Sequence, residues 1–170
     1  GIAPEKCVLA GTVYCDAMWD ELRTQVQYMS AFENASRLAP NRLSVLVAVP
    51  PSYHASRSNM NEFEDYKAMA LALARVGDND PRIEVTLSLH PTTPEEDRAI
   101  LKQAGVKLSD EWIVRLIPKH DVYISTFSST IRWALACGKP VINYNAYGYK
   151  CADYSCVEAV FESRSIQACG

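Results

Sequence analysis

The run RLSVLVAVPP, from Arg42 to Pro51, constrains the fold more than any other feature of the sequence. Its apolar residues follow one another almost without interruption, and Pro50 and Pro51 end it. A strand with one face in water alternates apolar and polar residues, whereas a strand buried on both faces does not. The run therefore predicts a strand that is covered on both faces.

Further strands and helices alternate along the rest of the chain. The segment RIEVTLSLHP predicts a second strand, in which apolar residues alternate with Glu84, Thr86 and Ser88. Other strands are expected in DVYIST, PVINYN and CVEAVF. Helices are expected from Asp16 (its cap) to Ala39, from a capping box of Asn61 and Glu64 to about Val76, from Thr93 to Gly105, in SDEWIVRLIPKH up to about Pro118, in SSTIRWALACG up to Gly138, and at the start SRS.

The helix with the strongest signals lies in TPEEDRAILKQAG. Thr93 is expected as its cap, Pro94 as its first helical residue, Glu96 as the second half of a capping box, and Gly105 as its end. Helices of this kind, placed between strands, cross over the sheet and make the strands parallel.

This alternation predicts an α/β fold, a Rossmann-like three-layer sandwich with a parallel sheet. We expect one domain over residues 1–170, with a linker and first helix in 1–40 and the sheet with its crossover helices in 41–170. Because the chain begins without Met, we expect it to be a fragment of a longer polypeptide.

Composition excludes several classes of function. The 170 residues carry a formal charge of −3, which argues against a nucleic-acid partner or a broad anionic-membrane surface. No apolar run approaches the ~20 residues of a membrane-spanning helix, and no signal-peptide pattern is present. The six cysteines include no CxxC pair, so a structural zinc site is not favoured. We interpret the chain as part of a reduced, cytoplasmic protein without an integral membrane segment, which other parts of the protein could attach to a membrane.

Polar residues follow several of the predicted strands directly, and in a parallel sheet these carboxyl ends meet at one edge, where ligands bind. The densest group is Thr126, Ser128, Ser129 and Thr130, between a strand and a helix start. Backbone N–H groups at a helix start, together with hydroxyl groups, suit a phosphate. The alternative is that Ser128 only caps the helix and its neighbours are ordinary loop residues.

His90 is the second candidate, because it follows the second strand and precedes Pro91, which favours an extended conformation. Its imidazole could donate to a phosphate oxygen. The alternative is a histidine that is hydrogen-bonded to a neighbouring loop. The other residues that we expect around the pocket are Ser52, Tyr53, His54, Pro91, Thr126, Asn145 and Lys150.

Weaker patterns favour no further site. Asp78 and Asp80 form a D-x-D pattern, but in a turn at the opposite edge of the sheet, where we also place His120. Arg57 could reach an anion, and Asp153 could lie at the pocket mouth. GxGxxG, a Walker loop and GxSxG are absent, so a dinucleotide, P-loop or hydrolase reading has no support. No metal and no cofactor are expected.

The segments SLHP and FSSTIRWALACGKPVI, about forty residues apart, resemble the carboxy-terminal half of GT-B glycosyltransferases. An HP motif with an SS/ST motif resembles bacterial sialyltransferases, capsule Kdo transferases and the CDP-glycerol glycerophosphotransferases of teichoic-acid synthesis. The opening PEKCVLAGTVYCDAMW is similar to the crossing into that second domain. The resemblance implies one half of a GT-B fold, partnered by an N-terminal GT-B domain, in a cytoplasmic enzyme of cell-surface polysaccharide synthesis.

By resemblance, His90 would contact the phosphate of a CMP-, CDP- or UDP-linked sugar donor, and Ser128, Ser129 and Thr130 would bind it at the helix start. The resemblance also implies metal-independent, inverting transfer, with the catalytic base on the N-terminal domain, so that the chain by itself would be inactive. Retaining enzymes have an acidic residue after the GKPVI strand, and here none precedes Asp153.

Two other functions stay open at this point. UDP-GlcNAc 2-epimerases have a related fold but carry Ser-Gly-Gly where this chain has Ser-Ser-Thr. The third reading is a non-catalytic module that binds a phosphorylated metabolite.

Overall fold

A computed structural model describes residues 17–26, 42–54, 62–126, 128–149, 154 and 157–169. Several expectations fall outside these residues. They are the Asp16 cap and helix residues 27–39, the start of the capping box at Asn61, the resemblance over 1–16, and the pocket candidates Arg57, Lys150 and Asp153.

The strands form one sheet in which all neighbours run parallel. They are β1 (Leu43–Val49), β2 (Ile83–Leu89), β3 (Leu108–Ser109), β4 (Val122–Ser125), β5 (Val141–Tyr144) and β6 (Val160–Ser163). Their order across the sheet is β3-β2-β1-β4-β5-β6. The prediction of an α/β Rossmann-like fold with a parallel sheet is confirmed.

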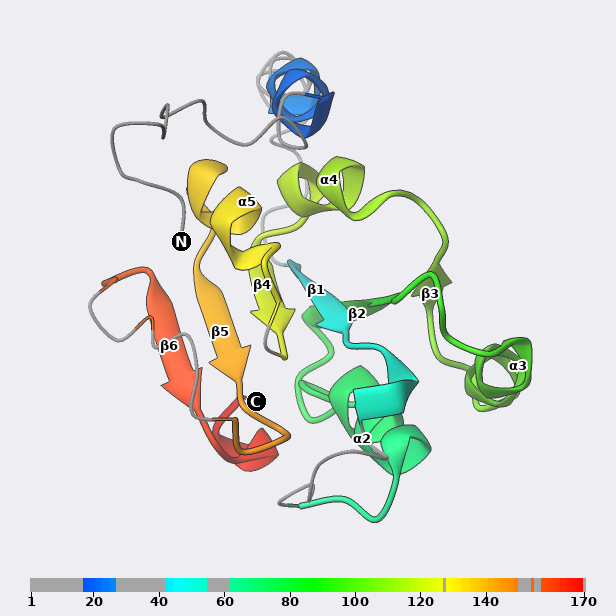
Figure 1. Cartoon of the computed structure of the whole chain (residues 1–170). Coiled ribbons are helices and arrows are strands. Elements are labelled where there is room, and N and C mark those ends of the chain that lie inside the picture. The colour runs from blue at the N-terminus through cyan, green and yellow to red at the C-terminus, as the bar shows by residue number, and fades with distance from the viewer. Residues whose placement is uncertain are drawn as a thin grey trace, which may run out of the picture.

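Helices cover both faces of the sheet (Figure 1). The helices are α2 (Tyr66–Ala74), α3 (Glu95–Gln103), α4 (Ile113–Leu116) and α5 (Ile131–Ala136), with 3-10 turns η3 (Ser52–His54), η4 (Ile117–Lys119) and η5 (Ile166–Cys169). Residues 17–26 are also helical. α2 and α3 lie on one face, and α4, α5 and the helical residues 17–26 lie on the other.

The two faces explain the continuous apolar run of β1. Val45, Val47 and Val49 pack into a core with α2 and α3, while Leu46 packs into a second core with α4 and α5. Since successive side chains of a strand point to opposite faces, a strand between two cores needs apolar residues at every position. β1 lies at the middle of the sheet, as a strand with this sequence should.

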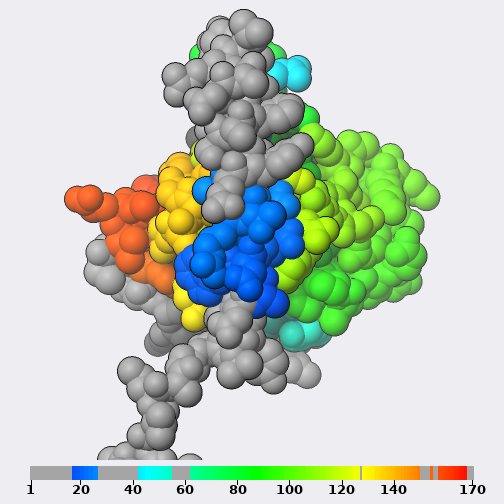
Figure 2. All heavy atoms as spheres, turned by 90° about the horizontal axis from the view of Figure 1, so that it is seen from above, coloured from blue at the N-terminus to red at the C-terminus, as the bar shows by residue number. Residues whose placement is uncertain are grey.

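The helical residues 17–26 are attached to the second face by three kinds of contact. Leu22 is buried in the core with α4 and α5. The Trp19 ring meets the Trp133 ring of α5 edge-on, with centroids 4.9 Å apart. Arg115 Nε of α4 donates to Glu21 at 2.7 Å. Figure 2 shows this segment lying over the face between α5 and α4.

Several element ends differ from the predictions. α2 begins at Tyr66, because Asp65 accepts a hydrogen bond from the Ala68 N–H at 2.8 Å and caps the helix there, after the expected box. α3 begins at Glu95, with Pro94 at the cap position. Thr93 does not cap it, since its hydroxyl pairs with the Tyr66 hydroxyl at 3.3 Å.

Other differences concern short elements. β3, an edge strand of two residues, was not predicted, because Leu108 and Ser109 are too short a run to show periodicity. The helical segment ends near Pro118 as predicted, since α4 ends at Leu116 and η4, which contains Pro118, ends at Lys119. β6 begins at Val160, later than CVEAVF indicated, and Gly105 follows α3 with a φ of 78°, as predicted for a helix end.

Candidate functional site

The site lies where the order of the strands reverses. From β1 the chain proceeds to β2 and β3 on one side, then returns to β4, β5 and β6 on the other. The connections after β1 and β4 therefore diverge, which opens a crevice at the carboxyl edge of the sheet. A cavity of about 890 Å³ lies there, lined by residues at the ends of β1, β2 and β3 and after β4.

The cavity brings together five of the eleven predicted site residues. His90, Pro91, Thr126, Ser128 and Thr130 line it. Ser52, Tyr53, His54, Ser129 and Asn145 are not among its lining residues, and Lys150 lies outside the described part of the chain.

The hydroxyl groups before α5 are hydrogen-bonded to one another. Ser128 Oγ accepts from the Thr130 N–H at 3.2 Å and lies 2.6 Å from Thr130 Oγ1. α5 itself begins at Ile131, so Ser128 caps the preceding turn rather than the α-helix. Ser129, between them, is exposed. α5 has only six residues, so its helix dipole is small. The hydrogen-bond donors at this end of the cavity are therefore mainly side chains.

Thr126 has a buried hydroxyl that finds no partner among the described residues. The residue is 1% exposed, and its Oγ1 makes no hydrogen bond to them. The same is true of Ser125 Oγ at the end of β4. Buried hydroxyl groups are nearly always hydrogen-bonded, and an unpaired one costs about 1–3 kcal/mol. Such groups next to a cavity indicate a polar site that the protein alone does not complete.

His90 is held in a defined tautomer. Its Nδ1 accepts from the Thr92 N–H at 3.2 Å and lies 2.8 Å from Thr92 Oγ1. In the neutral ring the proton must then be on Nε2, which can donate to a ligand in the cavity. Burial, and next the nearby His54, lower the pKa of His90 below its ordinary value, which favours the neutral ring.

Arg98 was missed by the sequence analysis, although it is the cation that organises the cavity wall. From the middle of α3 its guanidinium donates to the His90 carbonyl at 3.2 Å and to Asp110 at 2.7 Å. It therefore ties the loop after β2 to the loop after β3. In the sequence EEDRAILKQ, Arg98 resembles any charged residue on the exposed face of a helix. No sequence signal therefore distinguished it as a cavity residue.

The far wall of the cavity differs from the hydroxyl end. It comes from the β3–α4 connection and carries the carboxylates of Asp110 and Glu111 and the indole of Trp112, which is 45% exposed. Lys102 of α3 also lines the cavity. One end thus offers hydrogen-bond donors and the other an aromatic face with acceptors, an arrangement that suits an elongated ligand with an anionic group at one end.

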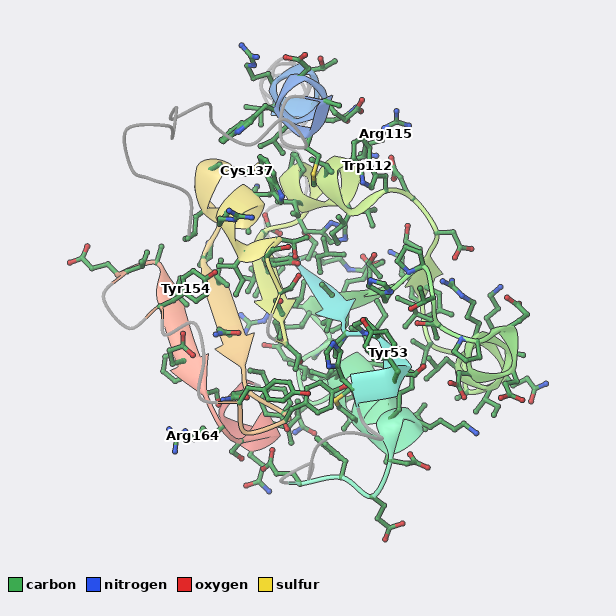
Figure 3. The ribbon with its side chains drawn as sticks, in the orientation of Figure 1. Tyr53, Trp112, Arg115, Cys137, Tyr154 and Arg164 are labelled. Atoms are coloured by element: carbon green, nitrogen blue, oxygen red, sulfur yellow. The ribbon has the colours of Figure 1, made fainter. Side chains whose placement is uncertain are left out.

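His54 lies beside the cavity in an aromatic cluster with Tyr53, Tyr147 and Tyr149. Its ring centroid is 4.6 Å from that of Tyr53, 5.8 Å from Tyr147 and 5.9 Å from Tyr149. Its Nδ1 lies 3.2 Å from the Tyr149 hydroxyl. Tyr53 belongs to η3, which follows the carboxyl end of β1 (Figure 3). The charge of His54 contributes to lowering the pKa of His90.

Asn145 has a different role from the one predicted by its position after β5. Its Nδ2 donates to the Tyr149 carbonyl at 2.8 Å, and its Oδ1 accepts from the Tyr149 N–H at 3.0 Å. Both ends of the amide are used, and they close the loop that carries Tyr147 and Tyr149. Asn145 thereby shapes the aromatic cluster.

The polar residues of the opposite edge are paired within the protein. Asp80 accepts from the backbone and the guanidinium of Arg82, and the Arg82 side chain holds the pKa of Asp80 at about 2. His120 Nδ1 lies 2.8 Å from the Leu116 carbonyl and donates to it. Among the described residues no group of His, Cys, Asp or Glu could hold a metal ion, and no helix is long and apolar enough to cross a bilayer.

No protein-family model matches the chain, and no curated protein has a significantly similar sequence. Solved structures do share its fold. The C-terminal CMP-Kdo-binding domain of WaaA from Acinetobacter baumannii matches with a TM-score of 0.51 over 86% of this chain and 85% of that domain, at 13% identity.

Two longer proteins also match. UDP-GlcNAc 2-epimerase from Neisseria meningitidis has a TM-score of 0.49 at 19% identity, covering 84% of this chain and 38% of the epimerase. KpsC from Thermosulfurimonas dismutans, a β-Kdo 2,7-transferase, has a TM-score of 0.44 at 19% identity, covering 76% of this chain and 44% of that protein. The chain thus spans less than half the length of each of these two.

Proposed function

We propose that this chain is the nucleotide-sugar-binding domain of a GT-B glycosyltransferase in cell-surface polysaccharide synthesis, with the donor phosphate at the hydroxyl end of the cavity. One observation carries the proposal: His90, Ser128 and Thr130, from two separate connections, line the same cavity at the switch point of the sheet. The WaaA domain, named for its binding of CMP-Kdo, has the same fold, which supports a cytidine nucleotide.

The proposed chemistry follows from what these groups donate. In glycosyl transfer, negative charge develops on the phosphate of the leaving nucleotide, and donors fixed in advance stabilise it. The His90 Nε2–H and the hydroxyl groups of Ser128 and Thr130 are such donors. Arg98 holds the His90 loop through its carbonyl. The acceptor hydroxyl also needs a general base, which we assign to another domain. The chain alone should therefore bind donor without turnover.

Titration of CMP, CDP and UDP into the chain, followed by NMR, tests the proposal. We expect chemical-shift changes at His90, Thr126, Ser128 and Thr130. The variants His90→Ala and Ser128→Ala should each weaken binding by about 1–3 kcal/mol, as expected for a hydrogen bond to a charged group. If none of the three nucleotides shifts these residues, the proposal is wrong.

Matched controls come from the opposite edge of the sheet. His120→Ala removes a histidine that also adjoins a strand, and Ser44→Ala removes a serine hydroxyl that is bonded to Asp121. Neither residue lines the cavity. Nucleotide affinity should be unchanged in both control variants. If the controls lose as much nucleotide affinity as His90→Ala and Ser128→Ala, the losses come from general destabilisation.

A further inference from the structure

Three hydroxyl groups connect the interior of the sheet with the cavity. Tyr123 of β4 is 1% exposed, and its hydroxyl is hydrogen-bonded to Thr130 Oγ1. Thr130 Oγ1 lies 2.6 Å from Ser128 Oγ, which also accepts from the Thr130 N–H. Thr130 and Ser128 line the cavity, whereas Tyr123 does not. A buried residue is thus linked to the cavity wall through one intermediate.

The buried end determines the direction in which the protons are donated. A phenol is a stronger acid than an aliphatic alcohol, so it is the better donor and the poorer acceptor. Burial raises the pKa of Tyr123 to about 12, and its hydroxyl keeps its proton.

This direction leaves one proton without an acceptor in the chain of three hydroxyl groups. Thr130 Oγ1 accepts from Tyr123, and the hydrogen bond between Thr130 and Ser128 uses only one of the two hydroxyl protons of that pair. Both residues line the cavity, so the other proton can be donated there.

We infer that Tyr123 is a positioning residue that, by donating to Thr130, leaves one hydroxyl proton of the Ser128–Thr130 pair for the cavity and so selects a phosphate oxygen at this end of it. This rests on the proposed function and adds to it the class of group that this end recognises. The buried, unpaired hydroxyl of Thr126 on the same wall independently indicates that the protein leaves a polar site here to be completed.

The test compares ligands with and without phosphate. Affinities are measured for whichever of CMP, CDP and UDP binds, for its nucleoside, and for inorganic phosphate. Tyr123→Phe and Thr130→Val should each weaken nucleotide and phosphate binding about three- to tenfold, the range that one ordinary hydrogen bond covers, and leave the nucleoside unchanged. Thr130→Ser keeps the hydroxyl chain and should bind like the wild type.

Tyr144→Phe is the matched control for the loss of a buried phenol. Tyr144 is buried as completely as Tyr123, but its hydroxyl donates to Glu62 at 2.6 Å and it does not line the cavity. We expect this variant to lose stability without losing nucleotide affinity.

The outcomes separate this inference from the proposed function. If Ser128→Ala weakens nucleotide binding but Tyr123→Phe does not, the role of Tyr123 is wrong and the proposed function stands. If Tyr123→Phe weakens nucleotide and nucleoside alike, the residue acts only on the fold, and the inference fails. If the wild type binds neither nucleotide nor phosphate, both are overturned.

Discussion

At the amino edge of the sheet, the Asp121 carboxylate accepts hydrogen bonds from the N–H and the hydroxyl of Ser44, at 2.8 and 2.6 Å. At the carboxyl edge, Thr126 has a buried hydroxyl with no partner among the described residues, and Ser128 and Thr130 line a cavity. The two edges contain similar residue types, histidine, serine and acidic or hydroxyl groups.

The difference lies in where the hydrogen-bond partners come from. At the amino edge Asp121 pairs with Ser44 of β1 and Asp80 pairs with Arg82 of its own turn, so both carboxylates find partners in the protein. At the carboxyl edge the connections after β1 and β4 separate, and a cavity takes the place of the partners. A polar residue that the sequence suggests as a binding residue is therefore available to a ligand only where the topology leaves its hydrogen-bonding groups unpaired at a cavity.

The largest effect on stability is expected at the amino edge. The Asp121 carboxylate accepts from both donors of Ser44 and so joins the start of β1 to the start of β4. Asp121→Ala removes this acceptor and should lower the free energy of unfolding by about 1–2 kcal/mol. Urea denaturation measures this. Asp78 is an exposed residue on the same edge, and its carboxylate makes no hydrogen bond to the described residues. Asp78→Ala should therefore change the free energy of unfolding little. Nucleotide affinity should stay unchanged in both, and a loss in Asp121→Ala would break the comparison.

A smaller effect of opposite sign is expected at the carboxyl edge. Thr126→Val replaces the unpaired buried hydroxyl by a methyl group of similar size and should raise the free energy of unfolding by about 1 kcal/mol. Ser163→Ala is the control, because Ser163 is buried too but its hydroxyl donates to the Ser165 carbonyl at 2.7 Å. That variant should be destabilised, and a stabilised Ser163→Ala would contradict the explanation.

The smallest effect is a change in histidine titration. The pKa values of His90 and His120 both lie below the ordinary value of 6.5, mainly through burial. Because the unfolded chain then binds protons more readily, both histidines reduce stability as pH falls through the range around 6.5. NMR titration should find His90 in the Nε2–H tautomer. A bound nucleotide should raise the pKa of His90 but not that of His120, because its phosphate favours the imidazolium form of a nearby histidine. An equal rise in the pKa of His120 would contradict a binding site at the carboxyl edge alone.

Much of the fold could be predicted because it depends on local patterns. The continuous run of β1, the alternation in β2 and the positive φ of Gly105 each reflect a rule that acts over a few residues. β3 could not be predicted in this way, since its two residues are defined by pairing with Leu87 and Ser88 of β2. The start of α2 was misplaced because several residues before it could cap a helix, and packing selects Asp65.

The candidate site was predicted to a similar extent. His90, Thr126, Ser128 and Thr130 follow strands directly, so the topology rule was enough to bring them to one edge. Arg98 could not be found, because a helical arginine faces the cavity only through the packing of α3. Tyr123, whose hydroxyl is hydrogen-bonded to Thr130, lies inside a strand and reads in the sequence as one of its apolar residues. Its contact with Thr130 depends on how β4 and α5 pack.

The sequence by itself determined the buried parallel sheet and the edge at which a ligand would bind, because burial on both faces and strand direction follow from the order of apolar and polar residues. Only the tertiary structure decided which polar residues at that edge remain open. It ties Asn145 to its own loop, leaves Ser129 out of the cavity lining, and links Ser128 to the buried Tyr123 through Thr130. The physical reason is that a hydrogen-bonding group is defined by the partners within its reach, and packing decides which partners these are.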